Sequence, residues 1–500
     1  MRPARRSLAG ALAGLSALVL AACTVGPNFH EPAPPTATGY TNAVDDINQG
    51  PVRAAIGEKV VADWWTLFRS PDLDRLVRLA VADSPTLAAS RARLEASREA
   101  IAAESGNLMV DATAGARREQ ANLGAFSGGS FSSLSIPGFP KFPTNPEFNL
   151  YSVGAVVSYN LDLAGGQRRR VESLRATEEA QERELDAAYL TLTGQVVAQA
   201  LTIGDANIQI GYLDDIVAND ESDLAMIRRA HAAGGASAAD VAAAESQLAQ
   251  DQGTVPAQKQ RLAAARHALA VLLGKTPDAW TPPNFDANTA GVLPTVLPVA
   301  VPSELVHDRP DILEAEAKLH AAVADVGVST ANLYPKITLN ASLNQDALTP
   351  QTLFAATSTS WNLGIGLTTP IFHSGQLKAK QREAQANAQA ALIDYQVTVA
   401  KAFGQVADIL TSLAHDNETY ADQTRALEAA QTKVDMMRRA YAMGGISAEQ
   451  LLQAERQWRR TRLMLSQQGY SRVGDAALLL LATANVPPGA AAGLGPVAAK

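Results

Sequence analysis

Apolar residues recur at every seventh position along two long stretches of the chain. They are Tyr189, Val196, Ile203, Ile210, Val217 and Leu224 in the first stretch, and Val399, Val406, Leu413, Tyr420, Leu427 and Val434 in the second. A seven-residue apolar period sustained over this many turns predicts long helices that pack as coiled coils. The first helix is expected from about Gln167 to His231, and at about 1.5 Å per residue it would be about 95 Å long.

The chain contains this arrangement twice, because the second stripe repeats the first 210 positions later. The helices that return from each long helix carry stripes of the same period, which are Val241, Leu248, Val255, Leu262 and Leu269 in the first copy and Leu451, Trp458, Leu465 and Leu479 in the second, with Arg472 as the exception. Two shorter helices, at about Pro85–Leu108 and Ser237–Leu273, together nearly match the long helix in length. Stacked end to end, they would pack along it.

Each long helix ends in the same short motif. Two arginines are followed by a glycine pair and then by a serine, in residues 228–237 and again in residues 438–447. Glycine adopts the left-handed conformation that ends a helix, and arginines complement the carbonyl end of the helix dipole. The serines are predicted N-caps, and Ser447 with Gln450 has the spacing of a capping box. The motif predicts two helical hairpins with tight tips, built on Gly234, Gly235 and Ser237 and on Gly444, Gly445 and Ser447.

Three stretches alternate apolar and polar residues with a period of two, which is typical of strands with one apolar face. They are Tyr151–Leu163, Ile337–Leu343 and Trp361–Ile371, and a weaker fourth lies at about Asp111–Arg118. Together they predict β-hairpins at about 111–163 and 336–371.

A half-buried sheet in water and a membrane-spanning sheet produce the same alternation. A membrane strand needs about 9–11 residues, which Tyr151–Leu163 and Trp361–Ile371 reach. Aromatic residues also mark equivalent strand ends, as they do in the girdles of membrane barrels. In a membrane, one set of residues would face the lipid, namely Tyr151, Tyr159 and Trp361, and another would face the lumen, namely Ser152, Ser158, Asn362 and Thr368.

Four strands cannot close a barrel, and an open sheet edge is not tolerated in hydrocarbon. A membrane sheet therefore requires several chains. Two chains would give about eight strands, whose interior is filled by side chains, whereas three would give about twelve and leave a conduit.

The N-terminus has the pattern of a bacterial lipoprotein signal. Three early arginines precede an apolar run from Leu8 to Leu20, and the sequence Leu20-Ala21-Ala22-Cys23 ends it. Cys23 is the only cysteine, so it is predicted to carry a lipid, with an ordinary export signal as the alternative. We expect a signal peptide at 1–22, a Pro-rich lipidated tether at 23–62, structural repeats at 63–290 and 291–484, and a disordered tail at 485–500.

Composition and motifs argue against several functions. The net charge of −8 argues against a nucleic-acid partner, and the seven histidines show no paired metal-ligand spacing. Nucleophile-elbow and phosphate-binding motifs are missing from the sequence, so neither an enzyme nor a metal or cofactor other than the covalent lipid on Cys23 is expected. The triplet Arg168–Arg170 is interpreted as a solvated helix start.

The duplicated order of strand hairpin and long helix resembles the outer-membrane efflux proteins, the TolC-like family. The lipobox with Thr24–Phe29, the pair Trp64–Trp65, and the segments Leu163–Gly166 and Pro370–Gly375 are similar to its NodT-type lipoprotein branch. The family usually has proline at the position of Val110, and the second half of this chain has proline there, at Pro335. Because Val110 departs from this pattern, the resemblance does not define where the first strand begins.

The resemblance implies an α+β membrane protein, with a trimeric 12-stranded β-barrel in the outer membrane continued by a periplasmic helical tunnel. It implies two partners, a periplasmic adaptor protein and an inner-membrane pump of the RND type. The tips at Gly234–Ser237 and Gly444–Ser447 would contact the adaptor, although the glycines could equally serve only the turns. A periplasmic gate is implied at four positions, which are Asp240, Tyr441, Gln450 and Gln453.

The gate also has a local alternative, because Asp240 could simply stabilise the dipole of its own helix. The function predicted from the resemblance is passive conduction of small molecules or drugs out of the cell in a tripartite efflux pump. Two other functions stay open: a duct for type I protein secretion, and a structural periplasmic coiled-coil lipoprotein without a pore.

Overall fold

The computed structural model describes residues 24–33, 39–40, 52–60, 63–106, 108–120, 147–283, 285 and 293–486. The chain forms two compact units, each assembled from three segments. Unit 1 contains residues 1–30, 97–177 and 319–390, and unit 2 contains residues 31–96, 178–318 and 391–500. The predicted signal peptide, Cys23 and the tail beyond Val486 lie outside the described residues.

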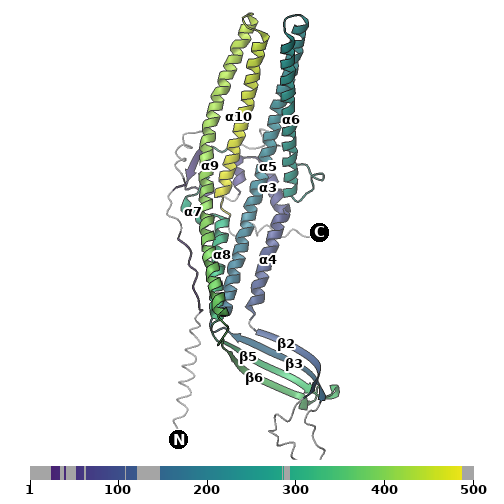
Figure 1. The fold of residues 1–500 in the computed structure, drawn as a ribbon, viewed down its shortest axis with the longest axis vertical. Helices are drawn as coiled ribbons and strands as arrows, with labels where there is room; N and C mark the ends of the chain where they lie inside the picture. The colour runs from purple at the N-terminus through teal and green to yellow at the C-terminus, as the bar shows by residue number, and fades with distance from the viewer. Residues whose placement is uncertain are drawn as a thin grey trace, which may run out of the picture. The chain divides into compact units, whose positions relative to one another are not determined.

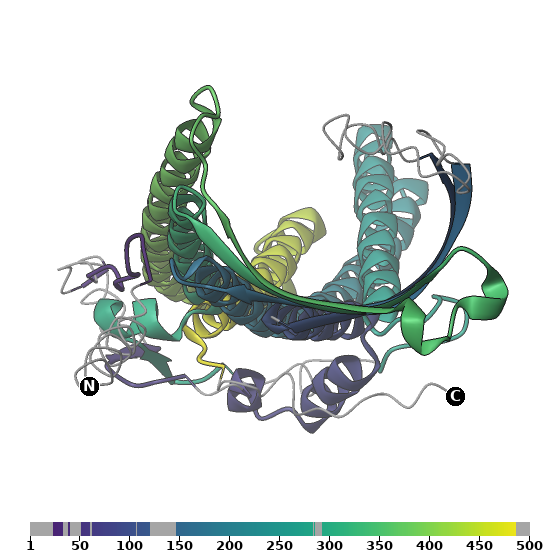
Figure 2. The same ribbon diagram turned by 90° about the horizontal axis from the view of Figure 1, so that it is seen from below.

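Unit 1 contains an antiparallel sheet of four strands in the order β2-β3-β5-β6 (Figure 1). The strands are β2 (Leu108–Gln120), β3 (Glu147–Leu161), β5 (Lys336–Ala347) and β6 (Thr359–Thr368). Both predicted hairpins are therefore present. The strand expected to be weak, β2, has 13 residues and begins before Val110. Short 3-10 helices at Pro350–Thr352 (η2) and Ala356–Ser358 (η3) connect β5 to β6, and the sheet is strongly curved (Figure 2).

The two long helices are α5 (Gly166–Ala232) and α9 (Gln376–Ala442), and each has 67 residues. Each begins in unit 1 and continues into unit 2. The returning helices are α6 (Ala238–Leu272) and α10 (Ala448–Thr483), which agree with the predicted hairpins. The remaining helices are α3 (Pro71–Asp83), α4 (Pro85–Ser105), α7 (Pro302–Asp308) and α8 (Pro310–Ala331).

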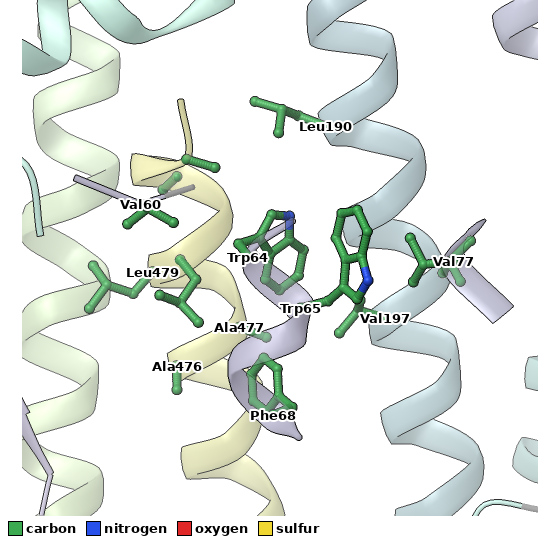
Figure 3. Packing of buried hydrophobic residues seen from close by; sticks show 14 of the residues in the cluster. Val60, Trp64, Trp65, Phe68, Val77, Leu190, Val197, Ala476, Ala477 and Leu479 are labelled. Carbon is green, nitrogen blue, oxygen red and sulfur yellow. The ribbon is translucent and has the colours of Figure 1, made fainter. Parts of the chain in front are cut away.

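The seven-residue stripes supply part of the core of unit 2. Val196 and Ile203 on α5 and Val406 and Leu413 on α9 are all fully buried. The 3-10 helix η1 (Trp64–Phe68) inserts three aromatic side chains, and Figure 3 shows them packed between α5 and α10. Burial of large aromatic side chains is a major source of stability. The η1 segment therefore holds α5 and α10 together near Val197 and Ala477.

A small parallel sheet in unit 2 was not predicted. Strand β1 (Arg53–Ile56) pairs with β4 (Val296–Val299), and Val60 forms a bridge with Ala484. Part of the range assigned to the tether is thus folded. The first residue assigned to the tail, Asn485, likewise donates its N–H to the carbonyl of Val60 at 3.1 Å.

Candidate functional site: an apolar sheet face and two helical tips

The register of the sheet in unit 1 separates its side chains onto two faces. Residues that lie opposite each other share a face, so Tyr159, Leu339 and Ile365 are neighbours on one side. The predicted lipid-facing residues Tyr151 and Trp361 lie on the same face, because they pair with Ala347 and Leu343 of β5. The opposite face carries the predicted lumenal set, namely Ser152, Ser158, Asn362 and Thr368.

The apolar face is largely uncovered in the chain. The exposed fractions along β6 are 77% for Trp361, 76% for Leu363, 70% for Ile365 and 66% for Leu367. A sheet in water packs its apolar face against another layer, and a continuous apolar patch of this kind marks contact with a membrane or a partner. The exposure therefore favours the membrane interpretation over a half-buried sheet in water.

The sheet also has two unpaired edges. In the order β2-β3-β5-β6, strands β2 and β6 each have a neighbour on one side only within the described part of the chain. Such edges carry rows of N–H and C=O groups that can pair with another chain. An apolar face with open edges is incomplete in a membrane until other strands extend it.

The two helical tips of unit 2 have the same geometry. Gly234 has a φ of 76°, and Gly235 donates its N–H to the carbonyl of Ala230 at 2.8 Å. Gly444 has a φ of 73°, and Gly445 donates to Ala440 at 2.9 Å. In each pair, the first glycine thus supplies the left-handed turn that ends the helix, as the sequence predicted.

Both predicted N-caps are confirmed and have complete capping boxes. The Asp240 carboxylate accepts the Ser237 N–H at 2.7 Å, while the Ser237 hydroxyl accepts the Asp240 N–H at 3.2 Å. Gln450 and Ser447 make the equivalent bonds at the second tip. Donation from the backbone and hydroxyl of Ser237 lowers the pKa of Asp240.

One salt bridge recurs at both tips and ties the two helices of each hairpin together. Arg228 and Glu245 are 2.7 Å apart, and Arg438 and Glu455 are 2.9 Å apart. These pairs are partly exposed, so each contributes modestly to stability.

The structure brings only some of the predicted gate residues together. Asp240 and Gln453 line one cavity of about 310 Å³ between α6 and α10. Gln450 serves its own cap, and Tyr441 is half-exposed and does not line this cavity. Within the chain, Asp240 therefore acts as the local helix-capping group, and a bond between Asp240 and Tyr441 stays a prediction about assembled chains.

A partly buried charge network near the tips was not predicted from the sequence. Arg459 and Arg460 of α10 lie 3.7 Å from Asp223 and 3.3 Å from Asp251, respectively. Burial and the neighbouring Asp251 raise the pKa of Asp220 to about 7. The available signal was that Asp220 follows a stripe residue of α5 by one helical turn.

The described residues lack both a membrane-spanning helix and a cluster of metal-binding side chains. None of their helices combines the length and the apolar character needed to cross a membrane. Their histidine, cysteine, aspartate and glutamate side chains form no cluster of three or more that could hold a metal ion.

The chain is similar to known proteins of the outer membrane. The chain is 29% identical to the outer membrane protein OprJ of Pseudomonas aeruginosa over 430 residues, which cover 85% of this chain and 84% of OprJ. It is 23% identical to Nodulation protein T of Rhizobium leguminosarum bv. trifolii over 482 residues, covering 96% and 97% of the two chains. The solved outer-membrane channel OprN superposes with a TM-score of 0.80 at 25% identity, covering 93% of this chain and 99% of OprN.

The chain contains a four-stranded sheet that is apolar on one face and two long helical hairpins. This is the fold of the outer-membrane channels. The family model described as outer membrane efflux protein matches residues 76–275 and 301–485. The chain belongs to this family and is an efflux protein of the outer membrane, as the resemblance predicted.

Proposed function

We propose that three copies of this chain assemble into a channel that passively conducts small molecules across the outer membrane. Each copy would contribute its four strands to a 12-stranded barrel, and α5, α6, α9 and α10 would continue the conduit into the periplasm. The observation that carries the proposal is the sheet of unit 1, which exposes its apolar face most fully along β6 and, within the described residues, leaves the outer edges of β2 and β6 unpaired.

The number of copies follows from the width of a barrel. Eight strands enclose little more than their own side chains, whereas larger barrels leave an aqueous channel. The polar face, with Ser152, Asn362 and Thr368, would line that channel, and the apolar face would contact lipid. A covalent lipid on Cys23 would anchor each copy to the membrane.

The proposed channel is the outer-membrane component of a tripartite pump. Its partners would be a periplasmic adaptor protein that binds the tips at Gly234–Ser237 and Gly444–Ser447, and an inner-membrane pump of the RND type. The energy would come from that pump, so the channel itself is proposed to be neither an enzyme nor dependent on a cofactor. Two features support this role, the paired tips of identical geometry and the similarity to OprJ.

Conductance of the purified protein in planar bilayers tests the proposal. We expect heat-modifiable trimers in outer-membrane fractions and discrete conductance steps after insertion. Trimers that insert without conducting would contradict the channel and favour the structural coiled-coil alternative. Export of a polypeptide that is lost when the gene is deleted, with drug sensitivity unchanged, would instead identify a protein-secretion duct.

A further inference from the structure

The three consecutive arginines at the start of α5 have different environments in unit 1. The side chains of Arg168 and Arg170 are 43% and 48% exposed, and they lie near Asp162 and Asp325. The side chain of Arg169 is only 3% exposed. The prediction of a solvated helix start is therefore wrong for Arg169, which is buried against the N-terminal segment of the chain.

Arg169 binds the segment Thr24–Phe29 at two points. Its Nε donates to the carbonyl of Val25 at 3.3 Å, and its Nη2 donates to the side-chain oxygen of Asn28 at 2.6 Å. Its third nitrogen, Nη1, donates to Glu172 at 2.8 Å. A buried guanidinium needs such partners for its N–H groups, and here the segment supplies two of them.

Glycines allow the segment to lie directly on the backbone of unit 1. Gly26 has a φ of 94°, and a Cβ added there would be 2.5 Å from the Cα of Gly327. A Cβ added to Gly327 would be 2.7 Å from the Cγ of Arg169, and one added to Gly165 would be 2.8 Å from the Cα of Thr24. No side chain larger than hydrogen fits at these contacts without a shift.

Both ends of the segment are held as well. The Val25 N–H donates to the carbonyl of Ala164 at 3.1 Å. The Phe29 ring stacks on His320 with a centroid distance of 4.5 Å and an interplanar angle of 14°, and His320 contacts Glu172 at 3.3 Å. Hydrogen bonds, stacking and close packing together indicate a built docking site rather than a passing contact.

We propose that Arg169 and its glycine neighbours form a docking site for the lipidated N-terminus, which fixes the acyl anchor at one end of the sheet. Gly165, which contacts Thr24, lies in the short connection between β3 and α5. Because consecutive Cα atoms are about 3.8 Å apart, a lipid on Cys23 would leave the chain within one residue of this connection. The anchor and the sheet would then enter the membrane as one body.

The inference rests on the proposed lipidation of Cys23, so the experiment separates the two. A nitroxide spin label is attached at Pro27→Cys in the full-length protein reconstituted in liposomes. Cys23 is the only natural cysteine, so labelling of the parent protein without Pro27→Cys would show that Cys23 is not acylated, whatever the result on docking. The label is then compared among the Arg169→Ala, Gly327→Ala, Arg170→Ala and Cys23→Ser backgrounds.

We expect an immobilised spectrum in the Pro27→Cys protein, in the matched control Arg170→Ala and in Cys23→Ser. Arg169→Ala and Gly327→Ala should give a mainly mobile spectrum, and they should lower the amount of trimer in the outer membrane at least twofold. A mobile label in the Pro27→Cys protein, or an immobile label in both disrupting variants, would overturn the docking site. A mobile label with an unchanged amount of membrane trimer would overturn the coupling of anchor and sheet, and Gly327→Ala keeps the test valid if Arg169→Ala does not fold.

Discussion

Asp186 is a buried carboxylate on α5 with few groups nearby that could stabilise its negative charge. It is 1% exposed, its nearest cation is Arg183 at 3.7 Å, and neither of its carboxylate oxygens has a hydrogen-bond partner within the described residues. Burial raises the pKa of Asp186 to about 7, against the opposing effect of Arg183. The folded protein therefore holds a proton on Asp186 at pH values where the unfolded chain, with a pKa of about 3.9, has lost it.

This residue makes the stability depend on pH in a defined direction. The contribution of Asp186 is most favourable below about pH 4, falls as the pH rises toward 7, and is constant above that. We predict that Asp186→Asn stabilises the protein at pH 8 by up to about 4 kcal/mol, because about three pKa units correspond to that free energy. The measurement is thermal unfolding of Asp186→Asn and parent protein at pH 5 and pH 8. The exposed Asp214→Asn on the same helix is the control, and an equal gain at both pH values would contradict the mechanism.

At the first tip, the observed capping role of Asp240 can be separated from the latch role predicted for it. Its carboxylate completes the capping box with Ser237, so Asp240→Ala also removes the bond from the Ser237 N–H to this carboxylate. Tyr441 is 44% exposed and has no such role. Tyr441→Phe removes only a hydroxyl that could donate to a carboxylate of a neighbouring copy.

We predict that Tyr441→Phe, alone and combined with Asp240→Ala, raises the single-channel conductance and sensitises cells to bulky antibiotics. Ser237→Ala is the matched control, because it weakens the cap but keeps both latch partners. If Ser237→Ala opens the channel as much as the double variant, the cap and not a latch holds the gate. Conductance at the parental level in normally assembled trimers of the double variant would rule the latch out.

Among the elements, the two glycines of each helical tip differ in backbone conformation, because only the first has a positive φ. Gly234 and Gly444 have positive φ and are required by the turns. Gly235 and Gly445 do not, and a Cβ added to them would meet only the carbonyl of Ala230 at 3.6 Å or of Ala440 at 3.4 Å. The second glycine of each pair can therefore be replaced at small cost to the fold.

We predict that Gly235→Ala with Gly445→Ala leaves the trimer intact but weakens crosslinking to the adaptor, because a glycine surface admits another backbone closely. Gly234→Ala with Gly444→Ala should instead lower the thermal stability, because alanine is strained at positive φ. Adaptor crosslinking is measured on membranes that contain equal amounts of trimer. Undiminished crosslinking in the first pair of variants would show that these glycines serve only the turns.

The long helices and strands were predictable from the sequence, and the shortest strands were not. The seven-residue stripes of α5 and α9 and the alternation in β3 and β6 extend over many residues, so each pattern is repeated often enough to be recognised. Strands β1 and β4 have four residues each and pair across more than 200 positions. No local pattern marks such a pairing, which depends on tertiary packing.

Individual contacts were predictable only where one local motif defines them. The capping boxes at Ser237 and Ser447 follow from residues three positions apart. Arg169 could not be distinguished from Arg168 and Arg170, because its burial depends on a segment about 140 positions away. The burial of Asp220 and Asp186 similarly depends on which helices pack around α5.

For the whole molecule, the sheet of unit 1 makes the sharpest prediction. Asn362 and Leu363 are neighbours on β6 and lie on opposite faces. Leu363 is 76% exposed and Asn362 is also exposed in the single chain. Water alone would therefore leave both positions open to a reagent, and only insertion in a membrane would make them differ.

We predict that Asn362→Cys reacts readily with a membrane-impermeant maleimide in channels reconstituted in liposomes, whereas Leu363→Cys is protected by lipid. The strand has only two faces, so the same division should hold for Ser158→Cys, which labels, and Tyr159→Cys, which does not. Unfolding the protein in denaturant should make all four positions react equally, which controls for intrinsic reactivity. Faster labelling of Leu363→Cys than of Asn362→Cys would invert the faces and contradict the barrel. Equal labelling of the pair in intact trimers would mean that the sheet lies in water, and the apolar face would then need a protein partner instead of lipid.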